Sequence, residues 1–144
     1  PLSLVESCTM PDGTVIAPDL PEPVQVVSAE SAKQTALILE NVLTQGGLAS
    51  QVEIPGYRIA GKTGTGEKSN GNGDYKTDAY STSLVGFAPA DDPKFVVMVS
   101  LDEPKTVRSS AASASAFQKA MTQVLKTYRV LPSDSETTLL PKYQ

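Results

Sequence analysis

Residues 57–65 of this 144-residue chain read Tyr-Arg-Ile-Ala-Gly-Lys-Thr-Gly-Thr, and they decide its fold. Tyr57, Ile59 and the small residues after them predict an extended strand whose end carries a lysine, two threonines and two glycines. Glycine lets another molecule approach the backbone closely. Lysine supplies a compact positive charge, and threonine hydroxyls donate and accept hydrogen bonds. The stretch therefore indicates a strand edge that binds an anion such as a carboxylate or a phosphate.

Three interpretations of this stretch compete. A surface strand running into a glycine-rich turn is the simplest. Gly56 to Thr63 also matches the P-loop pattern G-x-x-x-x-G-K-[ST], and residues 95–103 resemble a Walker B strand. A P-loop opens a helix at its lysine and threonine, whereas the glycine- and asparagine-rich residues 64–74 disfavour a helix. The third interpretation is the K-T-G box of penicillin-interacting serine acyltransferases.

Composition excludes several classes of function. The net charge of −4 and the absence of a basic stripe argue against nucleic-acid binding. With no histidine, the chain holds no Ser-His-Asp or Cys-His device and no histidine-ligated metal. Its carboxylates are scattered, so we expect no metal site and no cofactor. Cys8 is the only cysteine, and no apolar run approaches the roughly 20 residues that a membrane-spanning helix needs.

The first third of the chain predicts a hairpin, a stiff connector and a helix. Within residues 1–27, Pro11-Asp12-Gly13 signals a tight turn, and several prolines follow it. Ser28 is a good helix cap, and the helix should run to about Thr44. Its apolar face is predicted to comprise Ala32, Ala36, Leu39, Val42 and Leu43.

After the organising strand, residues 66–78 are predicted to form a mobile polar loop. Residues 79–88 and 94–101 predict two antiparallel strands joined by a turn, and the second should be buried on both faces. Residues 109–128 predict a helix with the apolar face Ala112, Ala116, Ala120, Met121, Val124, Leu125 and Tyr128. Residues 131–144 predict a loosely attached tail. The fold class is therefore α+β, an antiparallel sheet covered by helices, with residues 28–130 as its core.

Residues 52–104 resemble the K-T-G region of class B penicillin-binding proteins, the peptidoglycan transpeptidases, and most closely the division-specific kind. Two runs carry the resemblance: Pro-Gly-Tyr-Arg-Ile-Ala-Gly-Lys-Thr-Gly-Thr at 55–65, and Ser-Leu-Val-Gly-Phe-Ala-Pro-Ala-Asp-Asp-Pro at 83–93. It extends more loosely over nearly the whole chain. It implies the C-terminal portion of a transpeptidase domain with a penicillin-binding or serine β-lactamase-like fold.

In the resembled family, a serine in an S-x-x-K motif attacks a D-alanine carbonyl of a peptidoglycan stem peptide, and an amine from a neighbouring stem resolves the acyl-enzyme. β-Lactam antibiotics mimic that substrate. The resemblance implies that Lys62 supplies positive charge and aids proton traffic. It implies that Thr63 and Thr65 hold the substrate carboxylate, that the Thr65 N–H is an oxyanion donor, and that Gly64 leaves room for the ligand.

The sequence departs from the family pattern, since it contains neither the S-x-x-K motif nor the S-x-N motif. The nearest imitations are Thr-Gly-Glu-Lys at 65–68 and Ser-Asp-Ser at 133–135. We therefore expect a chain that begins between the S-x-N and K-T-G motifs and is inactive alone.

The expected partners are the rest of the transpeptidase domain, the stem peptide, β-lactams, and division or elongation proteins, with no nucleic acid. The expected location is the bacterial inner membrane, with the catalytic domain facing the periplasm or the extracytoplasmic space. The alternatives are a non-catalytic β-lactam sensor or division-scaffold module, then a D,D-carboxypeptidase or β-lactamase relative, and last a P-loop NTPase.

Overall fold

The structure is a computed structural model that describes residues 4–133. Its elements follow the predicted order of hairpin, helix, three strands and helix, with one additional short helix. They are β1 (Cys8–Thr9), β2 (Val15–Ile16), α1 (Ala29–Thr44), α2 (Ala49–Val52), β3 (Ala60–Ser69), β4 (Tyr75–Ala88), β5 (Phe95–Asp102) and α3 (Ala111–Thr127). Over the described residues, none of the helices is long and apolar enough to span a bilayer.

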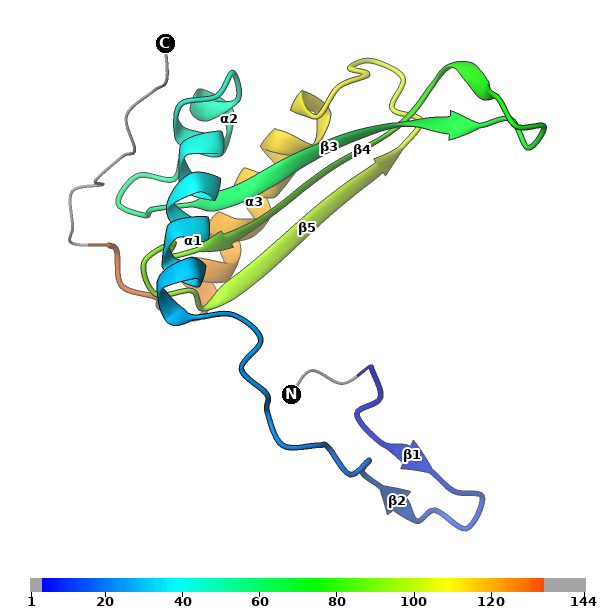
Figure 1. Cartoon of the computed structure of the whole chain (residues 1–144), viewed down its shortest axis with the longest axis vertical. Coiled ribbons are helices and arrows are strands. Elements are labelled where there is room, and N and C mark those ends of the chain that lie inside the picture. The colour runs from blue at the N-terminus through cyan, green and yellow to red at the C-terminus, as the bar shows by residue number, and fades with distance from the viewer. Residues whose placement is uncertain (1–3, 134–144) are drawn as a thin grey trace.

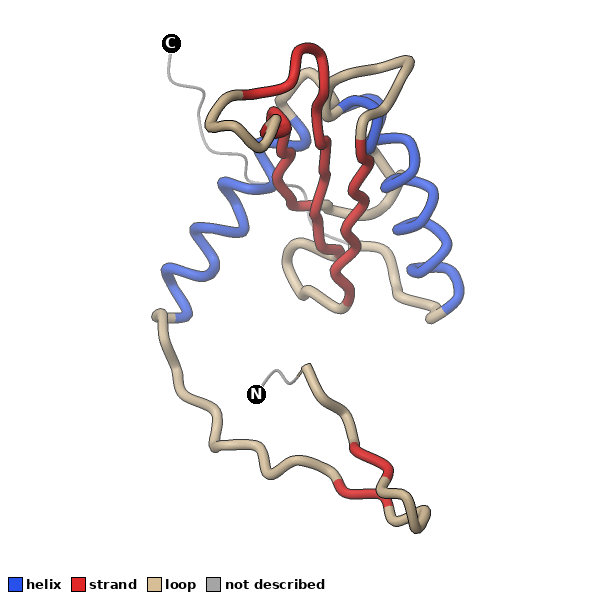
Figure 2. The backbone as a smooth tube through the Cα atoms, turned by 90° about the vertical axis from the view of Figure 1, so that its right-hand side faces the viewer, coloured by secondary structure: helices blue, strands red, loops and turns tan. Residues whose placement is uncertain are grey.

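The central sheet is antiparallel, with the strand order β3-β4-β5, which confirms the predicted α+β class. Figure 1 shows α3 running behind the sheet and α1 in front of the beginning of β3. In Figure 2, turned by 90°, the strands lie between these two helices. Accordingly, α1 packs on β3, whereas α3 packs on β4 and β5.

The hydrophobic core lies where the helices meet the sheet. Ser28 caps α1 as predicted, because its side-chain oxygen accepts a hydrogen bond from the Ser31 backbone N–H at 3.1 Å. On α3, the ring of Phe117 is fully buried against Gly86 of β4. The buried core residues are Leu43, Val52, Ile54, Ile59, Leu84, Ala88, Ala114, Phe117, Met121 and Leu125.

The predicted apolar faces of the two long helices are partly wrong. Ala32, Ala116 and Tyr128, which were placed on those faces, are exposed. Helix α3 instead buries Phe117 and the polar Ser113. The hydroxyl of Ser113 lies 3.4 Å from that of Thr82, so the start of the helix meets a polar part of the sheet. Apolar periodicity alone does not reveal such a contact.

Strand β5 is not buried on both faces, which corrects a prediction. Its burial alternates along the strand, and Val96 and Met98 are 70% and 65% exposed. Helix α3 covers the face that carries Val97 and Val99, and among residues 4–133 no element covers the other face. We call this open face, with Val85, Val96 and Met98, the open sheet face.

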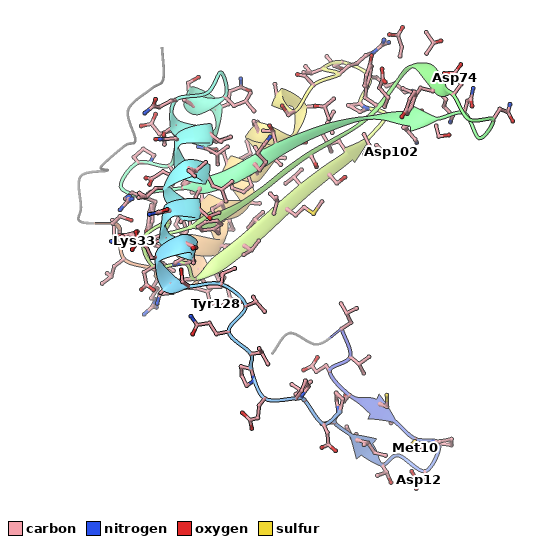
Figure 3. All side chains as sticks on the ribbon, viewed as in Figure 1. Met10, Asp12, Lys33, Asp74, Asp102 and Tyr128 are labelled. Atoms are coloured by element: carbon pink, nitrogen blue, oxygen red, sulfur yellow. The ribbon has the colours of Figure 1, made fainter. Side chains whose placement is uncertain are left out.

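The predicted polar loop at 66–78 is also largely wrong, because most of it is strand. β3 continues to Ser69, β4 resumes at Tyr75, and only residues 70–74 connect them. In Figure 1 this arm extends past the end of β5. The Nζ of Lys68 lies 2.8 Å from Asp102 Oδ1 and 3.0 Å from Glu103 Oε1, so ion pairs add to the backbone ladder here. Figure 3 labels Asp74 near the tip of the arm and Asp102 at the end of β5. Cross-strand pairing outweighs the low strand propensity of glycine.

The segment before β3 is less regular than predicted. The strand begins at Ala60 rather than at Tyr57, which instead forms an isolated bridge with Ile54. Gly56 has a φ of +81°, a left-handed conformation that glycine adopts without strain. The chain therefore turns at Gly56 and enters the sheet three residues after Tyr57.

The predicted N-terminal hairpin is present as β1 and β2, and the Gly13 N–H donates to the Met10 carbonyl at 2.9 Å. The described part of the predicted tail is not loosely attached, because the backbone N–H of Ser133 donates to the Gly56 carbonyl at 2.8 Å. The rest of that predicted tail, residues 134–144, lies outside the described residues. The predicted division at residues 28 and 131 stays a prediction.

Candidate active site

The four candidate site residues all lie on β3, an outer strand that pairs only with β4 among the described residues. Lys62 and Thr65 are exposed, and Thr63 and Gly64 are half-buried. The outer edge of β3 therefore presents backbone groups without a strand partner, a ready template for an extended ligand.

The register assigns these residues to the two faces of the sheet. Lys62 pairs with Val85, so it belongs to the open sheet face, and Gly64 belongs there too. Thr65 pairs with Thr82, whose side chain is buried beneath α3, so Thr63 and Thr65 belong to the helix-covered face. Their positions lie about 7 Å apart along the strand, since each residue advances it by roughly 3.4 Å. The cation and the two hydroxyls thus flank one strand edge from opposite faces.

The ammonium group of Lys62 is not neutralised by a carboxylate within residues 4–133. Its Nζ donates to the backbone carbonyl of Thr63 at 2.8 Å, which lays the side chain along the strand. Lys62 forms no salt bridge with another residue of the range 4–133, so its positive charge is available to an anion.

Two glycines of β3 lie close to neighbouring elements. A Cβ at Gly61 would overlap the backbone carbonyl of Val85 and lie 3.0 Å from Leu43 Cδ1 of α1. A Cβ at Gly64 would lie 2.7 Å from Ser83 Oγ on β4. The backbone contact excludes a side chain at Gly61, whereas the Ser83 hydroxyl can rotate away from a Cβ at Gly64.

Sequence reasoning missed one group beside the site, a buried ion pair between Glu40 of α1 and Arg58. Arg58 Nε donates to Glu40 Oε1 at 2.9 Å, and its Nη2 donates to Oε2 at 2.7 Å. The Glu40 side chain is 1% exposed and the Arg58 side chain 14%. The hydrogen bond to Glu40 is the main cause that raises the pKa of Arg58 above its ordinary value. A signal existed, because Glu40 lies between Ala36 and Leu43 on the apolar face of its helix, where a carboxylate needs a partner.

The geometry is not that of a P-loop. The chain stays extended from Ala60 through Ser69, so no helix opens at Lys62 and Thr63. The imitation of S-x-x-K at residues 65–68 is likewise strand, and Lys68 pairs with Asp102 and Glu103 instead of Thr65. Over residues 4–133, no group of three or more His, Cys, Asp or Glu side chains could hold a metal ion.

The K-T-G-T residues thus lie on an edge strand of an antiparallel sheet whose strands β4 and β5 pack against α3. The chain belongs to the penicillin-binding protein transpeptidase domain family, whose model matches residues 2–122. This match confirms the resemblance that the K-T-G and S-L-V-G-F-A-P-A runs indicated.

Two relatives show the extent of the similarity. The chain is 35% identical over 123 residues to the penicillin-binding protein PbpB of Mycolicibacterium smegmatis, covering 81% of this chain and 19% of that protein. It is 37% identical over 123 residues to the peptidoglycan D,D-transpeptidase FtsI of Escherichia coli K12, covering 83% of this chain and 21% of that protein. The chain thus spans about a fifth of the length of these relatives.

A solved structure shows the same fold. Penicillin-binding protein 3 of Mycobacterium tuberculosis, complexed with ampicillin, superposes with a TM-score of 0.74 at 27% identity, covering 96% of this chain and 33% of that chain. The partial transpeptidase-domain fold predicted from the sequence is confirmed by this neighbour.

Proposed function

We propose that this chain supplies the K-T-G strand of a peptidoglycan D,D-transpeptidase that also contains an S-x-x-K serine outside the sequence given. The observation that carries the proposal is β3 itself, a sheet edge that carries the exposed ammonium of Lys62, which pairs with no carboxylate within residues 4–133, and the hydroxyl residues Thr63 and Thr65. Family membership and the D,D-transpeptidase activity named for the Escherichia coli relative support it.

The proposed reaction is acyl transfer in two steps. The serine oxygen attacks the penultimate D-alanine carbonyl of a stem peptide, and the terminal D-alanine leaves as an amine that takes up a proton. An amine of a second stem peptide then attacks the acyl-enzyme, forming the cross-link and returning the serine its proton. A β-lactam undergoes the first step only, because its ring opens without releasing a leaving group that clears the site.

Each candidate residue has a role in this scheme. Lys62 places positive charge on the open sheet face, where it can assist proton transfer from the serine. The hydroxyls of Thr63 and Thr65 hold the ligand carboxylate with charge-assisted hydrogen bonds. The backbone N–H of Thr65 donates to the oxyanion, an interaction that is typically worth about 3 to 4 kcal/mol in the transition state. Gly64 has no side chain and so leaves room for the ligand above the strand.

The open sheet face supports the proposed partner, the remainder of the transpeptidase domain. Val85, Val96 and Met98 are exposed there by 39%, 70% and 65%, and a solvated row of apolar side chains next to Lys62 is unfavourable. A covering domain that carries the serine would bury this row and bring the nucleophile to the lysine. We further propose anchoring in the bacterial inner membrane through a segment outside this sequence, with division or elongation proteins as neighbours.

A labelling experiment with a fluorescent penicillin tests the proposal. The longer protein should become covalently labelled at one serine, and the 144-residue chain alone should not, because it lacks S-x-x-K. Intact-mass analysis counts the adducts. A stoichiometric adduct on the isolated chain would contradict the assignment of the nucleophile, and an unlabelled longer protein would favour a scaffold module. A β-lactam sensor or a β-lactamase relative would label but would not cross-link stem peptides.

A further inference from the structure

The Glu40–Arg58 ion pair joins α1 to the segment that leads into the K-T-G strand. A buried ion pair is seldom a better source of stability than well-packed apolar side chains of the same volume. The two parallel hydrogen bonds do something that apolar packing does not, since they fix the relative orientation of the two groups as well as their distance. This pair therefore sets an angle between α1 and the start of β3.

The backbone around Arg58 is held by two further elements. The Arg58 carbonyl accepts a hydrogen bond from the backbone N–H of Ala90, in the turn between β4 and β5, at 2.9 Å. Its N–H lies 3.4 Å from Ser133 Oγ, and the hydroxyl of Tyr57 donates to the Val130 carbonyl at 2.7 Å. Residues 57–59, which lead into β3 and are called the lead-in below, are thus held by α1, by the turn between β4 and β5, and by the segment that follows α3.

The distance from this anchor to the site is short. Lys62 follows Arg58 by four residues, about 13 Å of extended chain at roughly 3.3 Å per residue. Residues 60–67 pair continuously with β4, so no irregularity intervenes between the start of β3 and the site. A shift or rotation of the lead-in is therefore passed on to Lys62 and Thr65.

We propose that Glu40 and Arg58 are positioning residues for the K-T-G site, an inference that rests on the proposed transpeptidase function. Their ion pair holds β3 at the depth and orientation that place the Thr65 N–H at the attacked carbonyl and the Lys62 ammonium near the serine. Neither side chain touches substrate in this scheme. A misplacement of about 1 Å can cost a hundredfold in rate, so the effect should be measurable.

The test uses the longer protein and three variants. Glu40→Gln keeps the shape of the side chain but removes its charge. Arg58→Lys keeps the charge but removes the two parallel hydrogen bonds. The double variant Glu40→Leu with Arg58→Leu replaces the ion pair by apolar packing. Acylation by a chromogenic β-lactam is measured by stopped flow well below the melting temperature. We expect the acylation rate constant of each variant to fall about tenfold or more. The double variant should show this loss even if its melting temperature equals that of the wild type.

A control and an independent readout complete the design. Asp92→Asn removes an exposed ion pair in which Asp92 Oδ2 lies 2.7 Å from Lys94 Nζ, and it should acylate at the wild-type rate. Hydrogen exchange of the residue 63–65 amides should speed up in the Glu40 and Arg58 variants, relative to the amides of β5. A folded double variant whose acylation rate constant and residue 63–65 exchange rates equal those of the wild type would overturn the proposal. A wild-type protein that is never acylated would overturn the proposed function instead, and the exchange data would then decide whether the pair orders β3.

Discussion

The ring of Phe117 on α3 lies directly against Gly86 of β4, so closely that a Cβ at Gly86 would come within 2.6 Å of Phe117 Cζ. It would also lie 2.9 Å from the Ala60 carbonyl at the start of β3. This contact sets the distance between the helix and the middle strand of the sheet, and through Ala60 it reaches the strand that carries the site.

Gly86→Ala in the longer protein should therefore destabilise the fold by about 1 to 3 kcal/mol, as overpacking of a core does. Adding Phe117→Leu, which shortens the side chain, should recover part of that loss. Chemical denaturation of the single and double variants measures the coupling. If the two effects were simply additive, the ring would not be what excludes a methyl group at this position.

The residues around this contact also show what the sequence could and could not predict. The S-L-V-G-F run predicted a strand, and the structure confirms it as part of β4. The periodicity of α3 nevertheless omitted Phe117, because which apolar residue becomes buried depends on the glycine that it faces across the core. Likewise, the K-T-G motif predicted an extended strand, and the structure confirms it as β3. The sequence did not reveal the Glu40–Arg58 pair, because a buried ion pair between distant segments leaves no periodic signal. The open sheet face could not be predicted either, since the hydrophobicity of β5 does not say which element covers it.

The arm formed by the outer parts of β3 and β4 should open as the pH falls. The pKa of Glu103 is held below its ordinary value, chiefly by its hydrogen bond to Lys68, with Lys76 adding to the effect. A depressed carboxyl pKa stabilises the folded state at pH values above that of the unfolded group, about 4.3, and this contribution is lost as the pH falls through the lower folded value. The Lys68 partner has a raised pKa, so it stays charged over this range.

Hydrogen exchange of the residue 66–69 amides, corrected for the intrinsic pH dependence, measures this opening. Protection should fall below about pH 4 in the wild type, and Glu103→Gln should weaken that pH dependence. Glu67→Gln is the matched control, because Glu67 lies on the same arm and forms no ion pair with another described residue. An unchanged acid profile in Glu103→Gln would show that other carboxyl groups govern the arm.

The literal P-loop match at residues 56–63 should not bind nucleotide. Phosphate binding by that motif needs a backbone loop that wraps the phosphates and a helix N-terminus behind it. Here Lys62 and Thr63 continue an extended strand that is paired with β4. Calorimetry with ATP and magnesium should detect no binding at micromolar affinity, and a saturable magnesium-dependent signal that Lys62→Ala removes would restore the NTPase interpretation.

Thr65 should determine how well the longer protein recognises the ligand carboxylate. The residue is exposed on the outer strand, directly opposite the buried Thr82, so its hydroxyl is available to a ligand. Thr65→Val keeps the shape and the backbone N–H but removes that hydroxyl. Losing a hydrogen bond to a charged group should weaken the interaction by about 1.5 to 3 kcal/mol, which corresponds to roughly a tenfold to hundredfold drop in acylation efficiency.

Stability should barely change in this variant, because valine is a good strand residue and the side chain is exposed. Thr65→Pro should be worse than Thr65→Val, since it removes the backbone N–H together with the hydroxyl. Thr77→Val, at an exposed position of β4 outside the site, is the matched control and should acylate normally. Second-order acylation rates and melting temperatures should be measured together on all three variants. A folded Thr65→Val variant that acylates at the wild-type rate would mean that Thr65 is an ordinary strand residue and that the carboxylate is bound elsewhere.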